Sequence, residues 1–153
     1  MRDMRQPEHR VQWLTDLIRL EIALCDRVDA RLRERHDLPL SHFETLYLLY
    51  RGPGTGLRVG DLARRLRVTV GGTSKLVDRI EAAGLIRRIA DPADRRASRI
   101  VLTPAGRRAL SAAVDSYSTD LAATLDSALT GAEQKQLHEL VIRLLAVTTP
   151  PAS

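Results

Sequence analysis

Apolar residues recur every three or four positions through most of this chain, which predicts a mainly helical protein. The longest pattern runs from about Glu8 to Arg35 and carries two adjacent apolar stripes, so this helix is expected to contact two surfaces. Shorter patterns follow at about residues 41–50, 59–66 and 69–83, and two more helices are expected between residues 104 and 147.

Residues at the ends of these patterns indicate where the helices begin and end. Thr69 is placed to cap the helix that follows it, and Gly84 is placed to end that helix in a left-handed conformation. Thr103, followed by proline, predicts the start of the next helix. Capping-box spacing, in which a hydroxyl and a carboxylate satisfy two helix-end donors, occurs at residues 41–44 and 130–133.

A β-hairpin is expected between the central and C-terminal helices. Residues 85–90 and 99–102 are rich in apolar and β-branched side chains, and residues 91–94 between them read Asp-Pro-Ala-Asp, a turn sequence. Two short helices followed by a hairpin are typical of a winged helix-turn-helix. We therefore predict a mainly α single domain over residues 1–153, with the winged helix-turn-helix at 38–103 and its β wing flanked by long helices at 8–35 and 104–147.

Positive charge is concentrated in the predicted winged helix. Between residues 57 and 108, thirteen Arg and Lys oppose five Asp and Glu, which gives a net charge of +8, whereas the whole chain carries +5. A basic surface confined to one part of a chain favours contact with phosphates, because each neutralised phosphate releases counterions. The pattern indicates a double-stranded DNA partner.

Two consecutive glycines, Gly71 and Gly72, begin the second short helix. Glycine is unfavourable in a helix by about 0.8–1 kcal/mol in the interior and less near an end. Bare backbone N–H groups can approach a phosphate closely, and the short side chains of Thr73 and Ser74 can reach base edges. A frayed helix start is the alternative interpretation.

Arg95 and Arg96 follow the hairpin turn, where a guanidinium could enter a narrow minor groove. The alternative is a solvated run of charges. Asp94 beside them favours the first interpretation, since a carboxylate can hold an arginine by paired hydrogen bonds.

The composition excludes several other classes of protein. No apolar run exceeds five residues and the first ten residues lack a secretory signal, so we expect neither membrane insertion nor export, and a cytoplasmic location. The single cysteine, Cys25, cannot form an internal disulfide, and both Cys25 and Trp13 are interpreted as packing residues. The four histidines are dispersed, and no nucleophile lies in a convincing arrangement with a base, so we expect no metal, no cofactor and no enzymatic activity.

Five short motifs connect the chain to a known family: Gly60-Asp61-Leu62-Ala63, Lys75-Leu76-Val77-Asp78-Arg79-Ile80-Glu81, Gly84-Leu85-Ile86-Arg87-Arg88, Asp94-Arg95-Arg96 and Leu102-Thr103-Pro104-Ala105-Gly106. In these motifs the chain resembles the MarR family of bacterial transcriptional regulators, across nearly its whole length. The resemblance implies a homodimer, formed through the first and last helices, that binds a pseudo-palindromic operator and represses transcription, with activation as the alternative.

The resemblance also implies which residues contact the operator. The recognition helix, which is the helix predicted at about residues 69–83, would read the major groove. Arg79 would bind a phosphate, and Arg96 would be the wing-tip arginine, braced by Asp94 and assisted by Arg95. The DNA-binding set is Thr69, Val70, Gly71, Gly72, Thr73, Ser74, Lys75, Arg79, Asp94, Arg95 and Arg96. Many members carry Thr-Val-Thr-Arg where this chain has Gly72-Thr73-Ser74-Lys75, so the resemblance implies no base preference.

A small aromatic or anionic effector that releases DNA is a further implication of the resemblance. The residues expected to line its cleft are Trp13, Asp16, His42, Tyr47, Tyr50 and Arg51. The competing hypothesis is a winged-helix module that binds small molecules or proteins without regulatory DNA binding.

Overall fold

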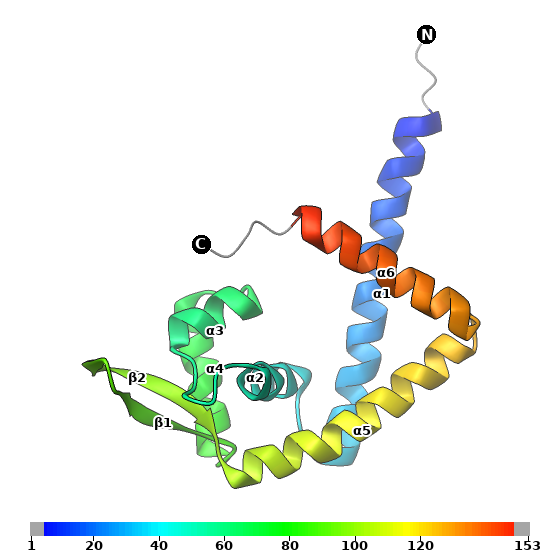
Figure 1. Cartoon of the computed structure of the whole chain (residues 1–153). Coiled ribbons are helices and arrows are strands. Elements are labelled where there is room, and N and C mark those ends of the chain that lie inside the picture. Colours follow the sequence, from blue (N-terminus) through cyan, green and yellow to red (C-terminus); the bar gives the residue numbers. More distant parts are fainter. Residues whose placement is uncertain (1–4, 149–153) are drawn as a thin grey trace. The chain divides into compact units, whose positions relative to one another are not determined.

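A computed structural model describes residues 5–148 of the chain, with side chains from Pro7 onward. Its elements follow in the order α1 (Arg5–His36), α2 (Leu40–Arg51), α3 (Val59–Leu66), α4 (Val70–Ala82), β1 (Ile86–Asp91), β2 (Asp94–Leu102), α5 (Pro104–Asp126) and α6 (Gly131–Thr148) (Figure 1). This order confirms the predicted mainly α fold with a β wing. The chain forms two compact units, which meet within α5 between Tyr117 and Ser118.

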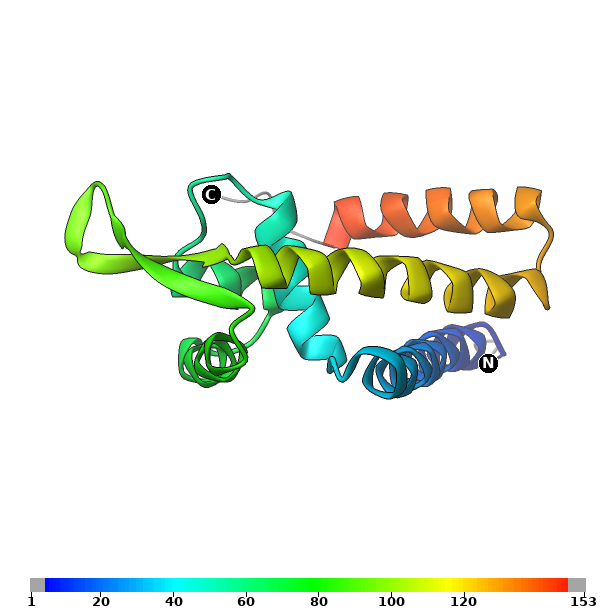
Figure 2. The same cartoon turned by 90° about the horizontal axis from the view of Figure 1, so that it is seen from below.

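The core of the first unit joins the winged helix-turn-helix to its flanking helices. Leu46 of α2, Leu62 of α3, Ile80 of α4 and Ile100 of β2 have no exposed surface. At the edge of this cluster, α1 contributes Val28 and Leu32, and α5 contributes Leu110 and Ala113. The wing leaves this core as a narrow two-stranded ribbon (Figure 2).

Most of the predicted helix ends are confirmed by hydrogen bonds. The Thr69 hydroxyl accepts from the Gly72 N–H at 3.1 Å, and Gly84 adopts the left-handed conformation with φ of 74°. The Thr103 hydroxyl accepts from the backbone N–H three residues later at 3.0 Å. In the second capping box, the Glu133 carboxylate accepts from the Thr130 N–H at 2.8 Å.

The capping box predicted at residues 41–44 is wrong. Helix α2 begins one residue earlier, at Leu40, and Ser41 lies within its first turn. The Leu40 N–H is instead satisfied by a carboxylate oxygen of Asp29 on α1, at 2.8 Å. A cap supplied from another helix removes the need for a local one.

The wing is longer than the sequence indicates. Its strands pair antiparallel from Ile86 opposite Leu102 to Ala90 opposite Ser98, and an irregularity follows before Asp91 pairs with Asp94. Leu57, in the loop between α2 and α3, forms a bridge to β2 at Ile100. Strand β2 therefore has a partner on each side near its C-terminal end.

Two helical faces remain apolar and uncovered in the chain by itself. The N-terminal half of α1 exposes Trp13, Leu14 and Ile18, each by about half, and α6 buries no residue. Cys25 is also exposed, so neither Trp13 nor Cys25 lies in the core of the single chain, and their interpretation as packing residues stays a prediction. No helix within residues 5–148 is long and apolar enough to cross a membrane.

Candidate nucleic-acid interface

The N-terminal turn of α4 is open to solvent and positively charged. Val70, Gly71 and Lys75 are exposed, and Ser74 is half-buried. Arg79 is exposed one turn further along, where its Nε donates to the Lys75 carbonyl at 3.2 Å. This turn therefore presents an apolar side chain, bare backbone and two cations on one element.

The two glycines of this turn have different surroundings. A Cβ at Gly71 would meet nothing within 4 Å, whereas a Cβ at Gly72 would lie 3.0 Å from Val68 Cγ1 and 3.1 Å from the Thr69 hydroxyl. Gly72 thus lets the preceding turn pack against the helix, and Gly71 leaves the backbone accessible from outside. Because Thr69 caps the Gly72 N–H, this helix start is ordered rather than frayed.

Thr73 does not belong to the exposed face, and its predicted contact with base edges is wrong. Its side chain is fully buried, and its hydroxyl donates to the Thr69 carbonyl at 2.9 Å. Thr73 lies four residues before Val77, so both face the core.

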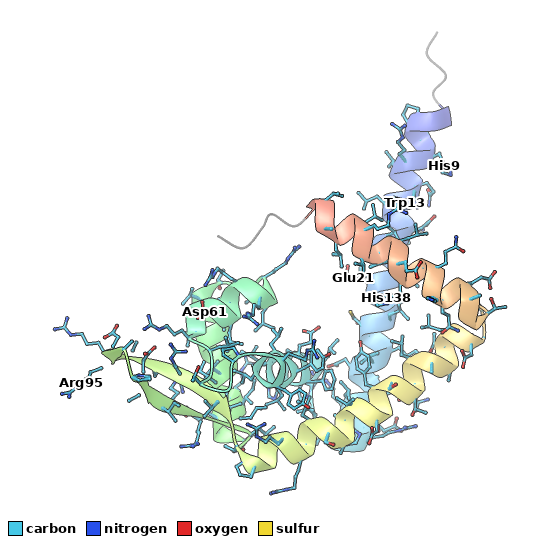
Figure 3. The ribbon with its side chains drawn as sticks, viewed as in Figure 1. His9, Trp13, Glu21, Asp61, Arg95 and His138 are labelled. Atoms are coloured by element: carbon cyan, nitrogen blue, oxygen red, sulfur yellow. The ribbon has the colours of Figure 1, made fainter. Side chains whose placement is uncertain are left out.

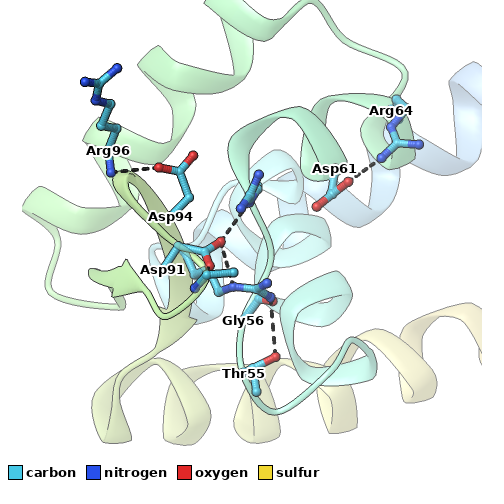
Figure 4. A network of polar contacts seen from close by, with 10 residues as sticks. Thr55, Gly56, Asp61, Arg64, Asp91, Asp94 and Arg96 are labelled. Atoms are coloured by element: carbon cyan, nitrogen blue, oxygen red, sulfur yellow. Dashed lines mark hydrogen bonds and ion pairs between the residues drawn. The ribbon is translucent and has the colours of Figure 1, made fainter.

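The tip of the wing carries two arginines without partners among the described residues. Arg95 and Arg96 are both exposed, and Arg95 reaches outward from the end of the hairpin (Figure 3). Asp94 Oδ1 accepts a hydrogen bond from the Arg96 backbone N–H at 3.0 Å (Figure 4). Asp94 therefore fixes the backbone at the tip, and the expected bond between its carboxylate and a guanidinium is not formed.

The outer end of the paired part of the wing holds a polar network that the sequence did not reveal. The Asp91 side chain is fully buried, and its Oδ2 accepts from Arg58 Nε at 2.7 Å and from Arg99 Nε at 3.0 Å (Figure 4). Its Oδ1 accepts from the Ala93 N–H at 2.9 Å. The hydrogen bond from Arg58, followed by that from Ala93, lowers the pKa of Asp91 to about 2. Asp91 is thus ionised at every pH at which the protein would work.

A second charged cluster attaches the first wing strand to the recognition helix. Glu81 accepts a hydrogen bond from the Arg88 backbone N–H at 2.9 Å and also pairs with the Arg88 guanidinium. The same guanidinium donates to Asp78 at 2.6 Å. Arg88 is therefore occupied within the chain, and part of the positive charge counted from the sequence is not available to DNA.

The residues predicted to bind an effector do not gather in one place. Tyr47 and Tyr50 of α2 line a cavity of about 280 Å³, together with Arg107, Leu110, Ser111, Val114 and Asp115 of α5. Trp13, Asp16, His42 and Arg51 are absent from its walls. The sequence interpretation did not include Arg107 among the effector residues. Its position in the first turn of α5, three residues before Leu110, indicates that both lie on the same face of the helix and could have identified it.

The other four predicted effector residues lie elsewhere. Trp13 is exposed on α1, Asp16 accepts a hydrogen bond from the Gln12 side chain at 2.9 Å, and Arg51 is exposed at the end of α2. His42 is half-buried in the first turn of α2. Burial, followed by the charges of Arg79 and Arg33, lowers the pKa of His42. His42 is thus within electrostatic range of cations on both α4 and α1.

Within residues 5–148, no group of three His, Cys, Asp or Glu side chains is arranged to hold a metal ion. The exposed groups of the interface are cations, bare backbone and apolar side chains.

The fold and this interface define a class, the winged helix-turn-helix proteins. Residues 36–97 match the family model of the MarR family of transcriptional regulators. Members of this family are DNA-binding transcription factors rather than enzymes. A segment of 52 residues is also 38% identical to the uncharacterized HTH-type transcriptional regulator YsmB of Bacillus subtilis (strain 168), and it spans 34% of this chain and 36% of that protein.

Solved structures resemble the chain over most of its length. Sco3205, a MarR family transcriptional regulator from Streptomyces coelicolor in complex with DNA, is 27% identical, with 95% of this chain and 90% of that one covered and a TM-score of 0.80. The transcriptional regulator BldR from Sulfolobus solfataricus is 26% identical, with coverage of 94% and 99% and a TM-score of 0.74. MepR of S. aureus, in its DNA complex, is 28% identical, with coverage of 89% and 96% and a TM-score of 0.70.

Proposed function

We propose that this protein is a homodimeric, sequence-specific DNA-binding repressor that recognises a pseudo-palindromic operator. The observation that carries the proposal is the pair of exposed cationic elements, the start of α4 and the tip of the wing, built on one compact unit. An accessible helix start with Lys75 and Arg79 suits a major groove, and Arg95 and Arg96 suit the adjoining minor groove. Two structures of similar proteins, Sco3205 and MepR, contain DNA, which supports the same assignment here.

The dimer is proposed from the apolar faces that the single chain leaves uncovered. On α6, seven large apolar side chains are exposed by 40% or more: Leu137, Leu140, Val141, Ile142, Leu144, Leu145 and Val147. Exposed apolar surface of this length is unusual for a monomer, and burial against a second copy would remove it from water. We therefore assign residues 8–35 and 104–147 to dimerisation and residues 38–103 to DNA binding.

The effector site is proposed at the cavity between α2 and α5. Its walls offer the aromatic faces of Tyr47 and Tyr50 and the guanidinium of Arg107, which has no partner among the described residues. These groups match a small molecule with an aromatic body and an anionic group. Binding there would release DNA if the ligand prefers the dimer shape in which the two recognition helices no longer match the operator spacing.

The test begins with selection of bound duplexes from random DNA, followed by affinity measurements on the selected sequence. We expect a dimer by analytical ultracentrifugation, an inverted repeat among the selected sequences, and an affinity that falls steeply with added salt. A monomer in solution, or equal affinity for all duplexes at low salt, contradicts the proposal. Ile142→Glu, which places a charge on the uncovered face of α6, should produce monomers that bind the operator weakly.

A matched control is available on the same helix. Lys135 is exposed near the start of α6, outside the run of large apolar side chains, so Lys135→Glu should leave the dimer intact. Competition by duplex RNA serves as a second control, because its deep, narrow groove does not admit a recognition helix.

A further inference from the structure

We propose that Asp91 is the positioning residue of the wing: it fastens the hairpin, at the point where regular pairing of its strands ends, to α3 and to the α2–α3 loop, so that the arginines at the tip meet DNA in one orientation. This inference rests on the proposed function, since it concerns how the wing serves DNA binding.

The contacts at Asp91 connect three separate parts of the chain. Arg58, the residue that precedes α3, donates to Oδ2 from Nε at 2.7 Å. Arg99 of β2 donates to the same oxygen at 3.0 Å, and the Ala93 N–H in the turn donates to Oδ1 at 2.9 Å. One buried carboxylate therefore binds the helix-turn-helix, the second strand and the turn.

Arg99 extends the network to the α2–α3 loop. Its Nη1 donates to the Gly56 carbonyl at 3.3 Å and to the Thr55 hydroxyl at 3.4 Å (Figure 4). Gly56 has φ of 85°, and a Cβ there would lie 2.5 Å from the Ile100 carbonyl oxygen, so only glycine allows the loop to lie this close to β2. The loop and the strand are thus in direct contact at the root of the wing.

The outer wing, beyond the network around Asp91, is exposed and irregularly paired. Regular pairing of the two strands ends at Ala90 and Ser98, and residues 92–96 are all exposed. A two-stranded hairpin is marginally stable by itself, so the direction of its tip depends on how the strands are held where their regular pairing ends. The network around Asp91 lies at the irregularity where regular pairing stops.

The charge of Asp91 gives the inference a sharp test. Asp91→Asn removes a negative charge from a DNA-binding surface, and electrostatics alone would therefore strengthen binding. If Asp91 acts by positioning the wing, the same change weakens binding instead. We expect a loss of about tenfold in operator affinity, and no larger than the loss caused by removing the tip arginines themselves.

A double-mutant cycle separates positioning from stability. In a chain that already carries Arg95→Ala and Arg96→Ala, Asp91→Asn should cause no further loss of affinity, because the groups that it positions are gone. A loss of the same size in both backgrounds, or no loss in the wild-type background, overturns the inference. Asp61→Asn is the matched control, since Asp61 pairs with Arg64 on α3 without touching the wing, and it should not weaken binding.

A second variant covers the case in which Asp91→Asn does not fold. Arg58→Gln leaves the pair between Asp91 and Arg99 intact, and Arg58 is largely exposed, so the core is not disturbed. It should weaken operator binding in the wild-type background and have no effect once Arg95 and Arg96 are alanine. If Arg58→Gln still weakens operator binding when Arg95 and Arg96 are alanine, Arg58 is a direct phosphate contact and the inference is overturned. If the wild-type protein binds no duplex at all, the proposed function fails first, before any variant is compared.

Discussion

Replacement of Arg96 by alanine tests the wing as a DNA-binding element. The Arg96 side chain is exposed and makes no hydrogen bond or ion pair within residues 5–148, whereas its backbone N–H is held by Asp94. Arg96→Ala preserves that backbone contact. We therefore expect the free energy of unfolding to change by less than about 0.5 kcal/mol, as for other surface positions.

The expected loss of DNA affinity follows from the two wings of a dimer. An arginine that fills a groove contributes about 1–3 kcal/mol, so two copies contribute about 2–6 kcal/mol. At about 1.4 kcal/mol per factor of ten, the dissociation constant should rise by roughly 30-fold to 10⁴-fold. The slope of log affinity against log salt should also become shallower by about 1.8, because each subunit neutralises about one phosphate charge fewer.

Fluorescence anisotropy with the selected operator, measured over a series of salt concentrations, checks both numbers. Lys135→Ala is the control, because it removes one exposed positive charge from α6, outside the winged helix, and should change neither the affinity nor the slope. An Arg96→Ala protein with unchanged affinity would refute the wing's role. A loss of affinity accompanied by a lower unfolding midpoint would refute the claim that Arg96 acts only on DNA.

Three further predictions concern individual residues. Thr73→Val should lower the free energy of unfolding by about 1 kcal/mol, through loss of the buried hydrogen bond to the Thr69 carbonyl, and should leave base preference unchanged in selection experiments. Val70 is 58% exposed at the start of α4, where an apolar side chain can contact the methyl group that thymine has and deoxyuracil lacks. Val70→Ala should therefore abolish any preference for thymine over deoxyuracil in the operator. Lys75→Ala should instead weaken binding to both duplexes equally. The pKa of His42 is lowered in the folded chain, so the neutral form of His42 stabilises the fold fully above about pH 6.5. This stabilisation declines as the pH falls through that value toward the folded pKa. The urea midpoints at about pH 8 and pH 5.5 should therefore differ less for His42→Gln than for the wild type.

The helix ends that the sequence predicted correctly are those whose hydrogen bonds are local. Thr69, Thr103 and Thr130 each cap a helix through an N–H within three residues, and the left-handed conformation of Gly84 follows a helix directly. Residue type and spacing determine such contacts, because few other partners compete for the same N–H group. The mainly helical fold and the hairpin followed in the same way from the period of the apolar residues.

The errors in the sequence interpretation had two sources: a partner supplied by a distant part of the chain, and a local periodicity that was overlooked. Ser41 does not cap α2, because Asp29, eleven residues before Leu40, reaches its first N–H. Thr73 was interpreted as a groove-reading residue from its position near a helix start, although its spacing from Val77 placed it on the buried face.

The sequence by itself determined that this is a winged helix-turn-helix protein with a basic interface, because periodicity, caps and net charge are properties of neighbouring residues. Only the tertiary structure decided which charges are available to DNA. Arg88 forms ion pairs with Glu81 and Asp78. Asp91 pairs with Arg99 and also with Arg58, which lies 33 positions before Asp91 in the sequence. Those pairings depend on how helices and strands pack. Packing brings together residues whose separation in the sequence does not predict that they will meet.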